Sequence, residues 1–457
     1  MSAILTDAIK KQLLQDVLAD FAEPNTRYYA GLGRSEDWDA EDVAAVPVTS
    51  PRDVRNARLG MQAVKNITDM TFCVTRSNWS LGATYSAYDD DFAGYPANSY
   101  YVMNTSQQVY LCLRQGSSNS NNGSSEQPVG NVNGRPFRTS DGYVWKFMYS
   151  IGALKASKFL SSAFMPVEFV ASTDSDSLSE VVEQKLVQDN AIVGQIVGYA
   201  VVNPGLNYSS TPVATVSGNG VGAFATPVIV GGQLTRLDVK TDSAGNILAD
   251  YVNNSYYGKG YDYASVVFSG GGTGEGAVVR PIFATKGGFG ADARDDMKSA
   301  QLMFNTKIIE GENDEFLINQ DFRQVLLLRN PLFGADSDGL FTESVGSTLH
   351  KLGVSSINSG PFVNDVIIEG QSSLAKAYID DTDSATIWYH QTEATGFKSF
   401  SPGETIESSA GATTGIVGAT LQGKVDPLSG ELLYIDNRAA VLRSADQTED
   451  IKIVIQL

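Results

Sequence analysis

The chain has 457 residues and a formal net charge of −19 at pH 7. Binding to nucleic acid depends on Lys and Arg that neutralise phosphates, so this charge argues against a nucleic-acid partner. The N-terminus lacks a basic-then-apolar leader, and no apolar run approaches the roughly 18 residues of a membrane helix. We therefore expect a chain that is made in the cytoplasm and has no membrane partner.

The composition favours strands. Tyr and Phe contribute 20 residues each and Gly contributes 44; aromatic residues are enriched in strands and glycine in turns. We predict a mainly β fold with a few helices, that is, an α+β framework that is multi-domain and sandwich-like and carries two inserted small β modules. Cys73 and Cys112 are expected to be buried small side chains.

The N-terminal part is predicted to begin with helices and to continue with strands. Residues 3–21 place apolar side chains at helical spacing until Pro24 stops the pattern, and residues 53–70 have a similar pattern. From Thr71 onward, apolar and polar residues alternate, which predicts strands near 72–75, 99–103, 108–114 and 143–149. The polar, glycine-rich residues 116–134 are predicted to form a loop.

An internal repeat occupies residues 190–285. The segment 205–229 recurs as 258–283 with an offset of about 53 residues, and each copy is expected to form strand, glycine turn, strand. Because one hairpin is marginally stable, we expect the two copies to pack into one β unit.

Residues 363–422 form a second block of short alternating segments, which predicts a small barrel or roll. Changes of composition at the edges of both blocks predict these domains: 1–188, N-terminal helices and β framework; 189–288, inserted repeat module; 289–334, framework strands; 335–423, inserted barrel or roll; 424–457, C-terminal framework strands.

The motifs for catalysis and cofactor binding are weak. Residues 272–277 fit G-x-G-x-x-A, but a dinucleotide site needs a helix after the glycines, and residues 278–281 are typical of a strand. The two histidines, His350 and His390, lie outside any zinc-binding pattern. We therefore predict no catalytic residue, no cofactor and no metal, although a carboxylate pair for glycoside hydrolysis is a property of the fold that sequence alone does not show.

Acidic and aromatic clusters leave alternatives open. Residues 89–91, 336–339 and 380–383 are interpreted as solvated turns, with calcium binding as the alternative, although none completes an EF-hand loop. The tyrosine-rich residues 95–101 and 256–263 are interpreted as core or as protein interface, with stacking on sugars as the alternative.

Four segments, at 28–38, 141–147, 321–332 and 430–457, stand out from the glycine-rich blocks between them. Their residues are Gly33, Arg34, Ser35, Glu36 and Trp38; Asp141, Gly142, Tyr143 and Trp145; Phe322, Arg323, Gln324, Asn330 and Pro331; and Asn437, Arg438, Asp446, Gln447, Thr448 and Glu449. Together, and in this order, they resemble the gene-product-eight family of baseplate wedge subunits from T-even-like phages. The blocks near 190–285 and 335–422 are longer than that family's pattern.

The resemblance implies a non-enzymatic structural protein of the virion tail baseplate, in which these residues have structural or interface roles. It implies a homodimer within each wedge of a contractile tail. The partners would be other wedge proteins, including the peripheral subunit that connects to the fibres. Two alternatives follow from the tyrosine clusters and the acidic residues: a carbohydrate-binding tail module that contacts the host surface, and a tail-associated hydrolase.

Overall fold

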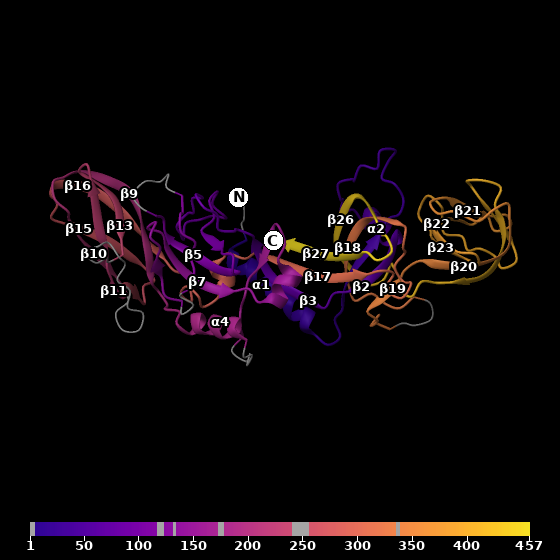
Figure 1. Cartoon of the computed structure of the whole chain (residues 1–457), viewed down its shortest axis with the longest axis horizontal. Helices are drawn as coiled ribbons and strands as arrows, with labels where there is room; N and C mark the ends of the chain where they lie inside the picture. The colour runs from indigo at the N-terminus through magenta and orange to yellow at the C-terminus, as the bar shows by residue number, and fades with distance from the viewer. Residues whose placement is uncertain (1–4, 117–122, 131–133, 172–177, 240–255, 335–338) are drawn as a thin grey trace. The chain divides into compact units, whose positions relative to one another are not determined.

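The computed structural model describes residues 5–116, 123–130, 134–171, 178–239, 256–334 and 339–457. Across these ranges the protein has five helices and 27 strands, which confirms a mainly β fold with a few helices (Figure 1). The chain divides into two compact units. The first comprises Met1–Gln12, Thr71–Leu302 and Gln456–Leu457, and the second comprises Leu13–Met70 and Met303–Ile455.

The second unit is organised around a five-stranded sheet, here called the framework sheet. Its strand order is β19 (Val345–Ser347), β2 (Met61–Asn66), β1 (Tyr28–Gly33), β18 (Asp321–Arg329), β26 (Glu431–Leu442). Every residue of β1 is buried between β2 and β18. A Cβ added at Gly31 would lie 2.7 Å from the Met61 sulfur, so the chains approach closely there. The core combines these residues: Tyr29, Ala57, Met61, Val64, Leu326, Leu328, Phe341 and Val425.

The predicted helix over residues 53–70 is wrong in its second half. Helix α2 (Pro51–Leu59) begins where the Ser50 hydroxyl accepts a hydrogen bond from the Asp53 amide at 3.2 Å, and it ends at Gly60. The next residues form β2, which pairs with β1 on one side and with β19 on the other. Pairing with two neighbouring strands outweighs the helical propensity of these residues.

Helix α1 (Asp7–Ala22) confirms the first predicted helix over its described residues. Its buried side differs from the expected one. Leu14 is buried, whereas Ile9 is 48% and Leu13 is 44% exposed. Strands β17 (Gln301–Ile309) and β27 (Thr448–Gln456) lie next to each other in a further sheet.

The predicted small barrel is confirmed; its first strand begins at His350, before the predicted block 363–422 and within the predicted domain 335–423. Six strands close it in the order β20 (His350–Asn358), β23 (Thr386–His390), β22 (Lys376–Thr382), β21 (Ile367–Gly370), β24 (Thr405–Ser408), β25 (Thr414–Leu421). Alternate residues point inward, as the period of a strand requires. The interior includes Leu352, Ile368, Ala377, Ile379, Ile387 and Ile406.

The first unit contains a sheet in the order β4 (Tyr101–Met103), β5 (Gln108–Arg114), β7 (Val144–Ser150), β6 (Phe137–Arg138), and β3 (Asp69–Thr75) pairs with β8 (Phe164–Pro166). These strands confirm the alternating pattern after Thr71. Helix α4 (Ser179–Asp189) contributes Val187 to the core beside Trp145. The remaining helices are α3 (Ala153–Phe159) and α5 (Ala293–Asp296). Cys73 and Cys112 are buried free thiols, as expected. Part of the loop predicted over 116–134 lies outside the described residues, and 123–130 hold no helix or strand.

The two repeat copies pair with each other, as predicted, and form the repeat module (196–283). Most of its strands pair across copies: β9 (Ile196–Tyr208) with β16 (Gly272–Phe283), β10 (Val213–Gly218) with β15 (Ala264–Ser269), and β11 (Val221–Ala223) with β14 (Tyr257–Lys259). Strand β12 (Thr226–Val230) pairs with β13 (Gln233–Asp238). Because β16 begins at Gly272, the predicted glycine turn is confined to Gly270 and Gly271.

Glycines of the repeat module surround two equivalent tyrosines. Tyr208 and Tyr261 lie 53 positions apart in the sequence and are 6% and 5% exposed. A Cβ added at Gly274 would lie 2.2 Å from the Tyr208 ring, and one added at Gly220 would lie 2.4 Å from the Tyr261 ring. The glycine cluster therefore serves close packing against aromatic rings, and the strand that contains it continues where a nucleotide site would need a helix.

Candidate functional site at the barrel junction

Three of the four motif segments meet on the framework sheet. Strand β18 lies between β1 and β26, so Gly33 pairs with Gln324, and Gln324 pairs with Asn437. The Gln324 amide also donates a hydrogen bond to the Asn437 side-chain oxygen at 2.8 Å. Residues from distant parts of the sequence are therefore neighbours because the strands that carry them are adjacent.

Arg323 holds the segment that follows β1. Its guanidinium donates to Asp42 at 2.7 Å and to Asp37 at 2.6 Å, and it also donates to the Ser35 carbonyl. The side chain is only 5% exposed. Burial alone would lower the pKa of Arg323, but the hydrogen bond and charge of Asp42 and the charges of Asp321 and Asp37 raise it. A buried arginine with several acceptors fixes the course of this segment.

Trp38 and Arg34 join the same assembly. The Trp38 indole N–H donates to the Arg438 carbonyl at 2.8 Å, and the Arg34 guanidinium lies 4.0 Å from the centre of the Trp38 ring. The contact is a cation–π interaction. The first, third and fourth segments therefore converge on one connected site.

This site continues into the barrel through a buried polar network. The Ser35 hydroxyl donates to one oxygen of Asp380 at 2.6 Å, and Nδ1 of His390 lies 2.6 Å from the other oxygen. Nε2 of His390 lies 3.7 Å from Glu36. Asp380 is fully buried and His390 is 3% exposed. Gln320 also donates to the Asp380 carbonyl at 2.7 Å. We call Ser35, Glu36, Asp380 and His390 the junction network.

Charge stabilises the junction network. Burial alone would lower the pKa of His390, but the neighbouring carboxylates of Asp380 and Glu36 raise it to about 10. The same imidazolium lowers the pKa of Glu36, against the effect of burial. At neutral pH a positive ring therefore lies between two carboxylates, and this arrangement links β22 and β23 of the barrel to the segment after β1.

The order of groups in the network differs from that of a hydrolase. A serine nucleophile needs an imidazole nitrogen at its hydroxyl to take the proton. Here the Ser35 hydroxyl donates to Asp380, and the imidazole is on the opposite oxygen of that carboxylate. The geometry suits a structural connection between two β elements.

The interpretation of residues 380–383 as a solvated turn is wrong for Asp380, which lies inside β22 and is fully buried. Sequence reasoning also missed His390, because its partner Glu36 lies more than 350 positions away in the sequence. Asp380 and His390 are ten positions apart on adjacent strands of one hairpin. The signal available in the sequence was a hairpin of alternating strands that carries acidic and imidazole side chains.

The remaining residues of the third and fourth segments support turns. The Asn330 side chain accepts a hydrogen bond from the Arg27 amide at 2.8 Å, and Pro331 follows it. Asp446 has a φ of 65° in the connection before β27, where the Gln447 side chain accepts from the Ser444 amide at 3.0 Å. Thr448 opens β27.

Glu449 binds Arg443, with 3.0 Å between Nε and a carboxylate oxygen. Arg443 is 2% exposed at its side chain and also donates to the Leu317 carbonyl at 2.9 Å. This pair therefore anchors the connection between β26 and β27 to the loop before β18.

The second segment belongs to the first unit and forms a separate centre. Asp141 accepts hydrogen bonds from the Ser125 amide at 2.8 Å and from the Ser124 hydroxyl at 2.9 Å, and Thr139 donates to its other oxygen. Burial raises the pKa of Asp141, but these donors outweigh it and the net shift is downward. Gly142 has a φ of 89° in the turn that follows, and Tyr143 stacks on Trp145 at 5.3 Å.

Of the other two acidic clusters, one forms ion pairs with an arginine and the other lies largely outside the described residues. Arg280 forms ion pairs with Asp89 and Asp90. Asp336 and Asp338 are outside the described residues. Within the part of the chain that the structure describes, no group of three or more His, Cys, Asp or Glu side chains is arranged to hold a metal ion.

The tyrosine clusters contain both buried and exposed rings. Tyr257 is 2% and Tyr261 is 5% exposed, so neither ring offers a face to a sugar. Tyr263 is 67% and Tyr95 is 44% exposed. Sugar stacking on the described part of the repeat module would therefore use the exposed rings of Tyr263 or Phe224, which is 45% exposed, and not those of Tyr257 and Tyr261.

Comparison with known proteins leaves the family open. No model of a known protein family matches the chain, and no curated protein is similar to it. Among the helices of the described ranges, none combines the length and apolar character needed to cross a bilayer.

Proposed function

We propose that the protein is a structural subunit of the baseplate wedge of a contractile phage tail. In this role it links inner wedge proteins to the peripheral proteins that carry fibres, during assembly and contraction. The observation that carries the proposal is the convergence of three motif segments on the framework sheet, where Gly33, Gln324 and Asn437 are neighbours. Motifs that lie far apart in the sequence but build one site in the fold share one structural role.

The surface of the repeat module supports a role in assembly. Its described residues include only six charged side chains. Eight of its apolar or aromatic residues are more than half exposed: Val202, Leu206, Val213, Val221, Val230, Tyr263, Val267 and Val278. Exposed apolar side chains gathered on a weakly charged surface are typical of protein–protein contacts.

Co-expression of the full chain with the other wedge proteins of the same phage tests the proposal. We expect a dimer by light scattering and a stable complex after affinity purification. A strictly monomeric chain that captures none of the wedge proteins contradicts the proposal.

A double variant tests the surface of the repeat module. Val213 and Val267 lie on the same exposed face of the β10–β15 pair and are 63% and 57% exposed. We expect the double change to serine to weaken the wedge complex and to leave the thermal stability of the isolated chain unchanged, because exposed positions contribute little to folding. The matched control is Ser217→Thr on the same face, which keeps the hydroxyl and should leave the complex intact.

A further inference from the structure

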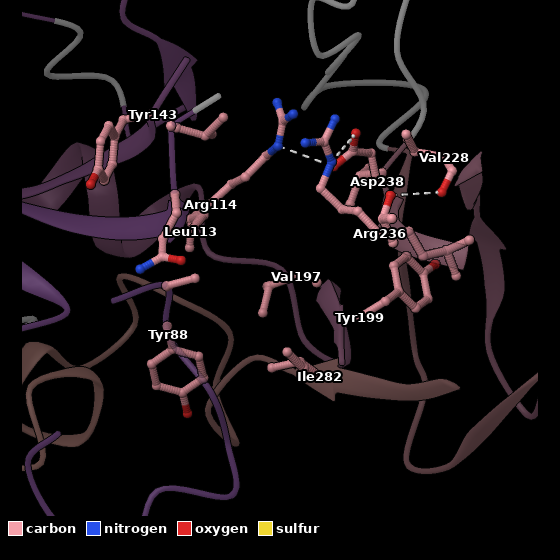
Figure 2. Close-up of a pocket in the computed structure, with 18 of the residues that line it drawn as sticks. Tyr88, Leu113, Arg114, Tyr143, Val197, Tyr199, Val228, Arg236, Asp238 and Ile282 are labelled. Carbon is pink, nitrogen blue, oxygen red and sulfur yellow. Dashed lines mark hydrogen bonds and ion pairs between the residues drawn. The ribbon is translucent and has the colours of Figure 1, made fainter. Parts of the chain in front are cut away.

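A pocket of about 580 Å³ lies inside the first unit. The β5 and β7 strands line one side of it, and β9, β12, β13, β14 and β16 of the repeat module line the other (Figure 2). Pockets that bind small molecules have volumes of about 300–1,000 Å³ and combine apolar walls with a few polar groups. This pocket has both properties.

The polar groups of the pocket carry an excess of positive charge. Nε of Arg114 lies 3.0 Å from an oxygen of Asp238, and Nε of Arg236 lies 2.9 Å from the same oxygen. Two guanidinium groups therefore share one carboxylate. Nη1 of Arg114 is buried and has no hydrogen-bond partner among the residues that the structure describes. A buried donor of this kind is costly unless an acceptor arrives.

The electrostatic surroundings of Arg114 agree with this excess of positive charge. Burial lowers the pKa of the Arg114 guanidinium; Asp238 raises it again in part, whereas Arg236 and Arg138 lower it further. Among the described lining residues, the one carboxylate of Asp238 does not neutralise the two guanidinium groups, so an additional anion would be stabilised here.

Beyond the charged groups, the lining is mainly apolar and aromatic, with Thr84, Gln115 and Thr235 as further polar side chains. Figure 2 shows Arg114 and Arg236 side by side at one end, with Val197, Ile282 and Tyr199 toward the other. A ligand that fills the pocket would therefore contact charge at one end and hydrocarbon at the other.

We propose that this pocket binds an amphipathic carboxylate: one anionic group at Arg114 and Arg236, and an apolar body over Val197, Tyr199 and Ile282. A bidentate carboxylate satisfies the fork of a guanidinium, and the apolar body removes hydrocarbon from water. The ligand is either a free small molecule or the carboxylate end of a peptide chain. Binding does not depend on the proposed role in the wedge.

Fluorescence titration of the full chain tests the binding site. Anilinonaphthalene sulfonate is an aromatic anion whose fluorescence rises in apolar pockets, and phenylnaphthylamine is a neutral analogue without the sulfonate. We expect saturable binding of the anion at one site per chain and weaker binding of the neutral analogue. Equal affinity for both probes would overturn the assignment of the charged end.

Three variants and one control place the site. Arg114→Gln and Arg236→Gln should each weaken binding of the anion by about tenfold, as loss of a charge-assisted hydrogen bond predicts. Asp238→Asn should strengthen it, because the competing carboxylate is removed. Lys259→Gln removes a positive charge at the end of β14, from a residue that does not line the pocket, and should leave the affinity unchanged. Equal losses in Arg114→Gln and Lys259→Gln would contradict the pocket. Circular dichroism checks that each variant is folded. If Arg114→Gln does not fold, Arg236→Gln and Asp238→Asn test the site.

Competition identifies the source of the ligand. Dodecanoate is compared with dodecanol, and acetyl-Leu-Phe is compared with its amide. Displacement of the dye by dodecanoate alone assigns the pocket to a free small molecule, and displacement by the peptide acid alone assigns it to a chain end. Displacement by both acids supports the shared carboxylate chemistry. If the neutral compounds compete as well as the acids, or if no acid competes, the proposal fails.

Discussion

The barrel and the repeat module are both predicted insertions, yet buried charge fixes the junction of the barrel and close packing fixes the repeat module. At the barrel junction, buried charges meet in fixed directions: Asp380 binds Ser35 and His390. In the repeat module, Tyr208 and Tyr261 pack against glycines with no charge involved. Directional polar contacts specify one orientation and are costly when one partner is lost, whereas close packing is sensitive to the volume of a single methyl group.

The largest expected effect comes from breaking the junction network. Asp380→Ala leaves the buried His390 ring without its closest carboxylate and leaves the Ser35 hydroxyl without its acceptor. We expect a loss of about 3–5 kcal/mol in the free energy of unfolding, as found when one partner of a buried pair is removed. Urea denaturation followed by circular dichroism measures this loss. A loss near zero would show that charge does not hold the barrel in place.

The second effect tests the packing of the repeat module. Gly274→Ala and Gly220→Ala each place a methyl group against an equivalent tyrosine ring, at 2.2 Å and 2.4 Å before any adjustment. Overpacking of this kind costs about 2 kcal/mol. Gly94→Ala is the matched control, because no atom lies within 4 Å of a Cβ added there. We expect equal losses at the two repeat positions and none at Gly94; a loss at only one would break the equivalence of the two copies.

The barrel and the repeat module also show which features of the fold could be predicted from the sequence. The alternation of residues was sufficient to predict the barrel, because the period of a strand is local, and the recurrence of one segment at an offset of about 53 residues was sufficient to predict the repeat. The helix predicted over 53–70 failed after Leu59, because pairing of Met61–Asn66 with two strands is not visible in a short window. Gly220 and Gly274 were predicted to belong to the repeat. The tyrosine rings that pack against them are positioned by strand pairing between the two copies.

The candidate site was predicted in part for the same reason. Motif residues such as Ser35, Glu36 and Arg323 were singled out by their order along the chain. Asp380 and His390 were not, since both lie in an inserted module and acquire their partners only when the barrel packs on the segment after β1. The convergence of segments hundreds of residues apart is a property of the fold, and it carries no local signal.

A pH series sharpens the comparison, because the junction carries a histidine whose proton is held by two carboxylates. The pKa of His390 is about 10 in the folded chain, above its ordinary 6.5. The folded state therefore retains a proton that the unfolded state loses. This contribution is complete below pH 6.5 and is lost as the pH rises toward 10, at up to about 1.4 kcal/mol per pH unit.

Urea unfolding of the wild type and of His390→Gln, between about pH 6 and about pH 9, measures the effect. The difference between the two curves isolates His390 from other groups that titrate in this range. We expect the difference to shrink steadily as the pH rises. A constant difference would mean that His390 is neutral in the folded chain, and the charged description of the junction would be wrong.

The smallest expected effect comes from an ion pair on the barrel surface. Lys376 and Glu369 are cross-strand neighbours on β22 and β21, their charged atoms are 3.1 Å apart, and their side chains are 45% and 41% exposed. Water and salt screen such pairs, so Glu369→Gln should change the free energy of unfolding by less than about 0.5 kcal/mol. The same denaturation assay, repeated at high salt, should give the same small value. A loss comparable to that of Asp380→Ala would show that the stability of the barrel is spread over its surface charges. The contrast between a buried, directional junction and the packing of tyrosine rings against glycines would then no longer explain how the two regions differ.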